Sequence, residues 1–394
     1  MILRLITYHL SPITFGSCLS NEDTGSEKAQ EYQAIRRQLT LFNLALTPAL
    51  LVMLIASGLH LRFAKWSAAL VGSNDWALVA VYFAIFSVYF LIFELPLSYY
   101  SGFYLEHNFD LSNQTFGAWL KDFVKRSVLS FALSLALIEL LYFVIRAAPE
   151  VWWLWAWAGY AFVSYVLGKV FPVVIVPLFY KYGKIEDREL AGKISGLAAR
   201  FGLPVRDVYS LNLSKTTKKA NAAFMGIGKT KRVVLSDTLI SNFTHGEIEV
   251  VIAHELGHYK QRDVWRLLGF GMITSLAAFF AGFCGINAWA VPLGIASASD
   301  VAGLPLLFLI FYVVSLVLAP LHSAFSRYCE RGADLFALKA CEDADVFISC
   351  MKKLGRVNLA EFEPPAWYEW FFYDHPSLSK RIKMAERFAQ KGNA

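Results

Sequence analysis

Six long apolar runs constrain this chain more than any other feature of its sequence. They cover roughly 41–61, 76–98, 127–145, 152–178, 264–291 and 302–320. Each has the length, about 20 residues, that an α-helix needs to cross the roughly 30 Å hydrocarbon core of a bilayer. Backbone polar groups find no partners in hydrocarbon, so such runs cross it as helices. The sequence therefore predicts a mainly α, polytopic membrane protein.

Composition supports a lipid bilayer as a partner and gives no sign of nucleic acid. Hydrophobic residues make up 56% of the chain and charged residues only 17%, against about 25% charged in an ordinary soluble domain. The net charge of +6 comes mostly from residues outside the apolar runs. This distribution suits loops that face anionic lipid, and no nucleic-acid-binding motif is recognisable. The five cysteines show no disulfide or zinc-finger spacing.

The spacing of the runs divides the chain into three expected parts. We expect a poorly defined tail over 1–30 and an N-terminal transmembrane domain with four spans over 31–178. The third part, 179–394, combines a long polar insert with two further spans at about 264–291 and 302–320. This third part carries the motifs described below, so we expect the chemistry there.

The distribution of basic residues predicts which side of the membrane the insert faces. Six spans place the tail, the 99–126 loop, the 179–263 insert and the residues after 320 on one side. The basic residues near the span ends on that side are Arg36, Arg37, Lys121, Lys125, Arg126, Lys181 and Lys184, and those on the other side are Arg62, Lys65 and Arg146. By the positive-inside rule the insert is cytoplasmic.

The insert reads as a small α/β unit. Residues 186–203 ("EDRELAGKISGLAARFGL") have the apolar spacing of an amphipathic helix. The segments "VRDVYSLNL" and "KRVVLSDTLI" are rich in β-branched residues and are predicted strands, with "GIGK" as a turn between extended pieces. We therefore expect a small β-sheet beside the membrane helices.

The stretch "VIAHELGHYKQRD" carries the strongest chemical signal. Thr244 with Glu247 three residues later forms a predicted capping box, so the following residues lie in a helix. Residues four apart on a helix share a face, so His254 and His258 point the same way. Two imidazoles in this H-E-x-x-H spacing bind zinc, and Glu255 takes a proton from a metal-activated water. The alternative is a structural helix that carries these residues by chance.

A catalytic zinc needs a third protein ligand and one open position. In "SRYCERGADLFALKA", Glu330 and Asp334 are four apart on a predicted helix and share a face. We expect Glu330 to complete the ligand set and Asp334 to orient a ligating imidazole from behind. Without the histidine motif, the same residues would read as surface charges after the last span.

These residues carry a resemblance to a known family. The segments "VVIAHELGHYK", "ERGADLFA" and "DHPSLSKRI" resemble the type I CAAX prenyl protease family of integral-membrane zinc endopeptidases. Further similar segments, such as "LPLSYYSGFYLEHNFDLSNQTFGAWLKD", extend the likeness through nearly the whole chain from about residue 31. The resemblance implies six to seven spans, a gluzincin-like zinc protease domain with a small β-sheet, and one zinc ion per chain.

The resemblance also implies roles for further residues. It repeats the zinc set of His254, His258 and Glu330, with Glu255 as the general base. His375 and Arg381 match family residues near the zinc and are expected to contact the transition state.

A substrate-binding strand is implied in the same way. Asn221, Ala222 and Ala223 lie in "KANAAF", which matches the segment beside which a peptide adds as a further strand. One departure stands next to it, because eukaryotic members usually have a serine–histidine pair where this chain has Lys219 and Ala220. That difference leaves specificity open.

Two substrate classes and one different function remain open at this point. The substrate is the C-terminal tripeptide of prenylated CAAX proteins, or it is a misfolded or unassembled membrane protein in quality control. The corresponding membranes are an ER-type membrane or a bacterial inner membrane. The alternative is a non-enzymatic membrane binding protein or transporter with a structural metal, although no inverted repeat of the transporter kind is recognisable.

Three charged residues fall inside the apolar runs: Glu94, Glu139 and Lys169. Charges at membrane depth usually face a bundle interior or a water-filled cavity. We expect them to line an internal chamber or to form ion pairs between helices.

Overall fold

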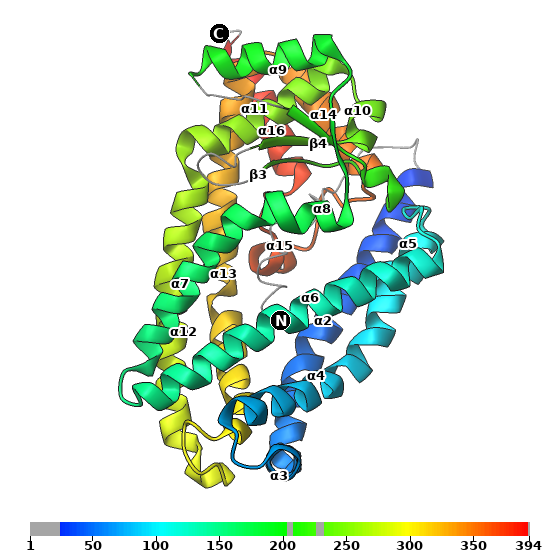
Figure 1. The fold of residues 1–394 in the computed structure, drawn as a ribbon. Coiled ribbons are helices and arrows are strands. Elements are labelled where there is room, and N and C mark those ends of the chain that lie inside the picture. Colours follow the sequence, from blue (N-terminus) through cyan, green and yellow to red (C-terminus); the bar gives the residue numbers. More distant parts are fainter. Residues whose placement is uncertain (1–23, 203–207, 226–231, 393–394) are drawn as a thin grey trace.

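The computed structural model describes residues 24–202, 208–225 and 232–392. Long helices form the lower part of the molecule, and shorter helices surround a small β-sheet in the upper part (Figure 1). The arrangement agrees with the predicted fold class, a polytopic helical membrane protein whose polar insert contains a sheet. The predicted turn at 226–229 lies outside the described residues.

Within the described residues, six helical segments are long and apolar enough to cross a membrane, which confirms the six predicted spans. They are Glu27–Ala56, Asp75–Asn108, Phe116–Ala147, Trp152–Phe179, Asp263–Trp289 and Val301–Cys341. The first begins earlier than its apolar run because a polar helical stretch precedes the span. That stretch lies level with the sheet (Figure 1) and makes contacts described below.

The helices that form these segments have the following bounds: α2 Thr24–Ala56, α4 Asp75–Tyr99, α5 Leu105–Asn108, α6 Phe116–Ala147, α7 Trp152–Val170, α8 Val176–Phe179, α12 Asp263–Trp289 and α13 Leu304–Cys341. Helix α3 (Leu59–Val71) connects α2 to α4 at the end of the molecule far from the sheet (Figure 1). Single π-helical turns at Tyr100–Tyr104 and Phe171–Ile175 join α4 to α5 and α7 to α8.

Apolar side chains cover the outside of the spans. Phe162, Ile273 and Val317 are 68%, 70% and 70% exposed in the protein alone. So much exposed apolar surface would be unfavourable in water and suits contact with lipid chains. Neighbouring spans pack as the pairs α12 with α13, α7 with α12, and α4 with α6.

The charged residues of the spans occupy different environments. Glu139 of α6 is partly buried, and its Oε2 has no hydrogen-bond partner among the described residues. Lys169 of α7 places its Nζ 4.4 Å from the centre of the Tyr165 ring, which is a cation–π contact within one helix. Glu94 of α4 is exposed.

The described residues form a sheet of four strands in the order β1-β2-β4-β3. The strands are β1 Tyr182–Lys184, β2 Val208–Leu211, β3 Ala222–Met225 and β4 Arg232–Ser236. Strands β2 and β4, both predicted from the sequence, are parallel. Strand β3 is antiparallel to β4, with Ala223 opposite Val234, and it has no other strand partner among the described residues. Strand β3 is therefore an edge strand of the described sheet.

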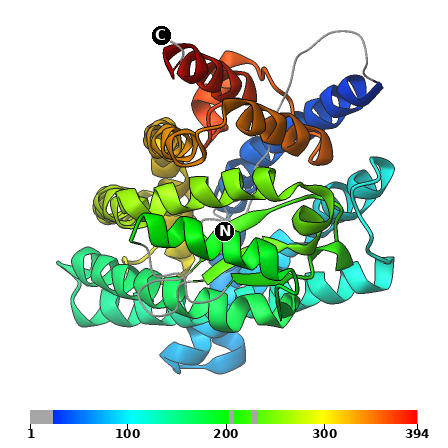
Figure 2. The same cartoon turned by 90° about the horizontal axis from the view of Figure 1, so that it is seen from above.

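The remaining helices enclose the sheet and have these bounds: α9 Arg188–Arg200, α10 Asp237–Asn242, α11 His245–Gln261, α14 Ala344–Val357, α15 Ala366–Phe372 and α16 Leu378–Gly392. Seen from above, α9 and α11 lie side by side over the strands (Figure 2). The predicted helix over 186–203 corresponds to α9. The capping box of Thr244 and Glu247 starts α11, as the sequence predicts.

Helix α13 joins the membrane part to the upper part. It runs without a break from the last span through Pro320 to Cys341, so Glu330 lies in the spanning helix itself rather than in a separate helix after it. Helices α11 and α13 approach very closely at Gly257, where an added Cβ would lie 2.9 Å from the Ala333 Cα. Only glycine permits this approach, and it places the two histidines of α11 beside Glu330.

We predict that Gly257→Ala destabilises the protein, because the new methyl group would push α11 away from α13. Overpacking of this kind costs about 1–3 kcal/mol. Thermal unfolding of the purified protein in detergent measures the effect. Gly196→Ala in α9 is the control, since an added Cβ there meets nothing within 4 Å, and it should leave stability equal or slightly higher. Equal melting temperatures for both variants would contradict the close contact.

Candidate metal centre

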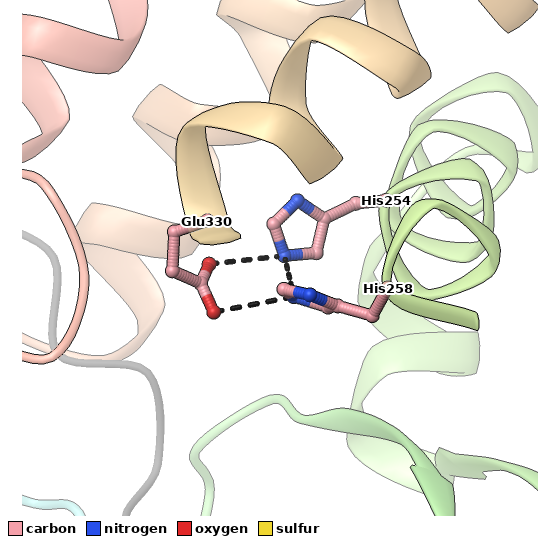
Figure 3. Close-up of side chains that lie close together, drawn as sticks. All are labelled: His254, His258 and Glu330. Carbon is pink, nitrogen blue, oxygen red and sulfur yellow. Dashed lines mark hydrogen bonds and ion pairs between the residues drawn. The ribbon is translucent and has the colours of Figure 1, made fainter. Parts of the chain in front are cut away.

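Three side chains from two helices converge on one point. Nε2 of His254 and Nε2 of His258 lie 3.2 Å apart. Glu330 Oε2 is 3.2 Å from the first nitrogen, and Glu330 Oε1 is 3.2 Å from the second (Figure 3). Among the described residues, this is the one group of three acidic, histidine or cysteine side chains whose ligand atoms all lie within 4.8 Å of one another.

A carboxylate stands behind each imidazole. His254 Nδ1 donates to Asp334 Oδ1 at 2.9 Å, and His258 Nδ1 donates to Asp263 Oδ2 at 3.0 Å. Each ring thus carries its proton on Nδ1, which leaves the Nε2 lone pair directed at the common point. This is the usual arrangement behind metal-ligating histidines.

The sequence placed Asp334 behind an imidazole but missed Asp263. Arg262 adopts a left-handed conformation, with φ of 59°, between α11 and α12. This turn sends Asp263 back toward His258, and its carboxylate is almost wholly buried. The only sequence signal for this role is that Asp263 is an acidic residue five positions after His258. Its direction depends on the turn, which the sequence does not reveal.

The charges of the cluster favour a cation. Burial lowers the pKa of His254 and of His258, but the neighbouring carboxylates outweigh it and hold the pKa of both rings above its usual value. Glu330 Oε2 is buried without a hydrogen bond of acceptable geometry. A buried carboxylate oxygen without a hydrogen bond is unfavourable unless a positive charge approaches it.

The donor set fits a metal ion in both chemistry and spacing. Two imidazole nitrogens and a carboxylate oxygen suit zinc, with three protein ligands leaving one position open. Ligands about 2.0–2.1 Å from a tetrahedral ion lie roughly 3.3–3.4 Å apart. The two Nε2 atoms are 3.2 Å apart, and each of them lies 3.2 Å from a different oxygen of the Glu330 carboxylate. The residues present therefore match the ion that the motif implies.

His375 lies next to this group. Its Nε2 is 3.2 Å from Glu330 Oε1, and its Nδ1 is 2.8 Å from Asp374 Oδ1. Burial lowers the pKa of His375, but Glu330 and Asp374 together raise it to about 9. The structure thus brings this predicted residue to the site from the far end of the chain.

Arg381 is brought to the same region but faces another partner. It is 2% exposed, and its Nε donates to Asp334 Oδ2 at 2.7 Å while Nη2 donates to Asp334 Oδ1. Its guanidinium thus lies on the Nδ1 side of His254, away from Glu330. Glu255 follows His254 in α11 and is partly exposed, and its charge acts on His258.

A second network, which sequence reasoning missed, holds the segment that carries His375. Arg327 of α13 is 7% exposed, and its guanidinium donates to the backbone carbonyls of Glu369 and Trp370 at 3.0 and 3.3 Å. The Glu369 side chain accepts from Ser377 N at 3.1 Å. Since Arg327 and Glu330 are one turn apart on α13, the same helix fixes Glu330 and the loop that brings His375 to it.

The predicted substrate segment also lies near the cluster. Strand β3 packs against α11, the helix with the two histidines. Asn221 precedes the strand and pairs inward, with its N–H donating to Ser236 Oγ at 2.9 Å and its carbonyl accepting from Ser236 N at 2.8 Å. Ala222 and Ala223 form the start of the edge strand.

Comparison with known proteins covers almost the entire chain. Residues 9–181 match the family model described as CAAX prenyl protease N-terminal, five membrane helices, and residues 184–389 match peptidase family M48. The structure describes four candidate spans in the first of these ranges.

Two relatives illustrate the similarity. The uncharacterized metalloprotease YhfN of Bacillus subtilis is 30% identical over 364 residues, which are 91% of this chain and 85% of the relative. CAAX prenyl protease 1 of Saccharomyces cerevisiae is 29% identical over 318 residues, 76% of this chain and 70% of the relative. The fold matches the crystal structure of S. mikatae Ste24p with a TM-score of 0.85 and 24% identity, over 97% of this chain and 95% of that one.

We predict that Asp263→Asn weakens zinc affinity by about 10–100-fold, the usual effect of losing a carboxylate behind a ligating histidine. Competition between the purified protein and a chromogenic chelator measures the affinity. Asp187→Asn is the matched control. Asp187 also pairs with a histidine of α11, His245, at 2.8 Å, but outside the group of three. Equal affinities for the two variants would show that Asp263 does not support the metal.

Proposed function

This chain belongs to peptidase family M48 as an integral, multi-pass membrane metalloendopeptidase, and on that premise we propose that its metal is zinc, held by His254, His258 and Glu330. The observation that carries the proposal is the convergence of these three ligand atoms within 4.8 Å, with a carboxylate behind each ring. Nitrogen and carboxylate donors together favour zinc over harder cations, which prefer oxygen alone.

We assign the proton transfers to Glu255. Zinc, when bound, polarises the scissile carbonyl and lowers the pKa of the attacking water. The Glu255 carboxylate, beside His254 and partly exposed, accepts a proton from that water and passes it to the amine that leaves. Within the H-E-x-x-H motif both imidazoles would serve as metal ligands, which leaves the carboxylate as the proton acceptor.

His375 and Arg381 take different roles in this scheme. His375 Nε2 lies 3.2 Å from Glu330 Oε1, beside the proposed metal site, so an N–H at this nitrogen is suited to stabilise the oxyanion that develops on the carbonyl oxygen. Arg381 holds Asp334, and Asp334 holds His254. We therefore assign Arg381 to positioning a ligand rather than to contact with substrate.

The peptide substrate would add to the sheet as a strand beside β3. It would lie beside Asn221, Ala222 and Ala223. The N–H and carbonyl of Asn221 already pair with Ser236, so main-chain hydrogen bonds from alternate residues, such as Ala222, would hold the peptide extended with little demand on its sequence. The edge of β3 has no strand partner among the described residues, and the strand packs against the helix of the histidines. A bound peptide would thus pass in front of the proposed zinc site.

The proposed orientation places this site on the cytoplasmic side. The spans run in alternate directions, so the 99–126 segment, the sheet and the proposed ligands lie at one end of the molecule (Figure 1). The basic residues near the span ends are concentrated on that side, and the positive-inside rule makes it cytoplasmic.

Two substrate classes fit the site: prenylated proteins that end in a CAAX sequence, and unfolded or unassembled membrane proteins in quality control. Curated relatives named CAAX prenyl protease support the first. Strand addition, which reads backbone rather than side chains, supports the second. A non-enzymatic binding protein or transporter is not favoured, because the chain matches a peptidase family over its whole polar part.

One assay separates these possibilities. The purified protein is incubated with a farnesylated CAAX peptide, with its unmodified form and with an unfolded membrane protein, each with and without a zinc chelator. We expect chelator-sensitive cleavage that zinc restores. Cleavage of the farnesylated peptide alone identifies the first class, and cleavage of the unfolded protein identifies the second. No chelator-sensitive cleavage of any of the three would refute the proposed peptidase activity on these substrate classes.

We predict that Glu255→Gln lowers kcat by about 10²–10⁴-fold, the contribution expected of a general base, while the protein keeps one zinc ion. Elemental analysis and cleavage rates provide the two measurements. Glu249→Gln, in the same helix but outside the site, serves as control and should retain full activity. Near-normal turnover by the Glu255 variant would refute the assignment of the base.

A further inference from the structure

Lys219 is buried, although the proposed reaction makes no use of it. The residue is 7% exposed and stands two positions before Asn221, at the entrance to the edge strand β3. Lysine is almost never buried unless its charge is paired, because desolvation of an ammonium group is costly. A buried lysine at this point in the chain therefore requires an explanation.

The partners of Lys219 come from the membrane part of the molecule. Its Nζ lies 2.8 Å from Glu106 Oε2 and 2.9 Å from the Tyr32 hydroxyl. The Tyr32 hydroxyl in turn donates to Glu106 Oε1 at 2.5 Å, so the three groups form a closed ring of hydrogen bonds. Burial lowers the pKa of Lys219, and the Glu106 carboxylate opposes that shift.

Two membrane segments therefore meet the sheet at this point. Tyr32 is 1% exposed and belongs to α2. Glu106 belongs to α5, which follows the π-helical turn after α4. The ends of α2 and α5 lie next to each other near one end of the sheet (Figure 1). The ring of hydrogen bonds joins both helices to the start of β3.

The backbone from Lys219 to Asn221 is hydrogen-bonded at every residue. The Lys219 carbonyl accepts from Thr238 Oγ1 at 2.7 Å. The Asn358 side chain accepts from Ala220 N at 3.0 Å and donates to the Ala220 carbonyl at 3.2 Å, as a neighbouring strand would. Asn221 continues the pattern with Ser236. These contacts fix residues 219–221 immediately before β3.

We propose that Lys219 is a positioning residue for the peptide substrate, because its ring with Glu106 and Tyr32 fixes the edge strand β3 against the membrane helices. The inference rests on the proposed function, in which the peptide pairs with that edge. It makes α2 and α5 part of the peptide-binding machinery, so that the membrane part sets the place at which a peptide enters.

The effect of losing Lys219 follows from where the peptide binds. Strand pairing is made equally in the bound substrate and in the transition state, so weakening it raises KM and leaves kcat unchanged. The ligand group is not touched by the ring, and zinc content should stay the same. A purely structural role would lower stability without this division between KM and kcat.

The test uses the full chain in detergent and a quenched-fluorescence farnesylated CAAX peptide, with labelled unfolded membrane protein as the second probe. We expect Lys219→Met, which keeps the length of the side chain but removes its charge, to raise KM by about tenfold, equivalent to ~1.4 kcal/mol of binding. The control is Lys218→Met, the exposed neighbour, which should leave KM unchanged. Zinc content and melting temperature are measured for both variants.

Two further measurements keep the test decisive. Glu106→Gln should raise KM alone, and the double variant with Lys219→Met should fall short of the product of the two single effects, because both remove one interaction. If Lys219→Met does not fold, the KM of the Tyr32→Phe variant tests the positioning role instead. This variant retains the ion pair and removes one hydroxyl, and it should raise KM by a smaller factor.

The outcomes separate this inference from the function it rests on. Chelator-sensitive cleavage by the unmodified protein with equal KM in the Lys219 and Lys218 variants would overturn the positioning role and leave the peptidase standing. Reduced kcat with lost zinc in the Lys219 variant would also overturn it. If the unmodified protein cleaves neither probe, both proposals fall. The dissociation constant of the peptide provides an independent measure of affinity. It is compared between the Glu255→Gln variant, which should bind without cleaving, and the same variant with Lys219→Met.

Discussion

The close contact between α11 and α13 is the constraint on which the rest of the structure depends. Gly257 lets the backbone of one helix approach Ala333 of the other, and the histidines on either side of that contact then reach Glu330. Any larger side chain would separate a group whose members must lie within about 3.3–3.4 Å to share an ion. Gly257 is therefore needed for the close approach of the two helices, just as the histidines and Glu330 are needed to bind an ion.

Charge around this contact is arranged in layers. Glu330 faces the two imidazoles, Asp334 and Asp263 stand behind them, and Arg381 stands behind Asp334. Each buried charge thus has a partner of opposite sign or a hydrogen-bond donor, which is the condition for keeping charges out of water. Among the described residues, the space between the Nε2 atoms and Glu330 is the place where three such ligand atoms could hold a cation.

The membrane helices do more than anchor the sheet. Helix α13 carries the last span, the Glu330 carboxylate and, through Arg327, the support for the His375 segment. At the other end of the sheet, α2 and α5 enclose Lys219. The spanning helices therefore hold both the edge strand and the proposed metal centre in position. A peptide that pairs with β3 would be aligned with the proposed ligands, because the same helices hold the strand and the ligands.

The sequence by itself determined the features that depend on local pattern. Six apolar runs gave six spans because length and hydropathy suffice for a helix in lipid, and the capping box with the His254–His258 spacing placed both imidazoles on one face of α11 because helical period does so. Four-residue spacing likewise paired Glu330 with Asp334. The strand β1, only three residues long, left no readable period. Tertiary structure alone decided that Asp263 turns back to His258, that Arg381 faces Asp334, and that Lys219 is buried against Glu106. The physical reason is that each of these contacts joins groups whose directions are set by a turn or by packing between distant helices, and no local periodicity encodes that.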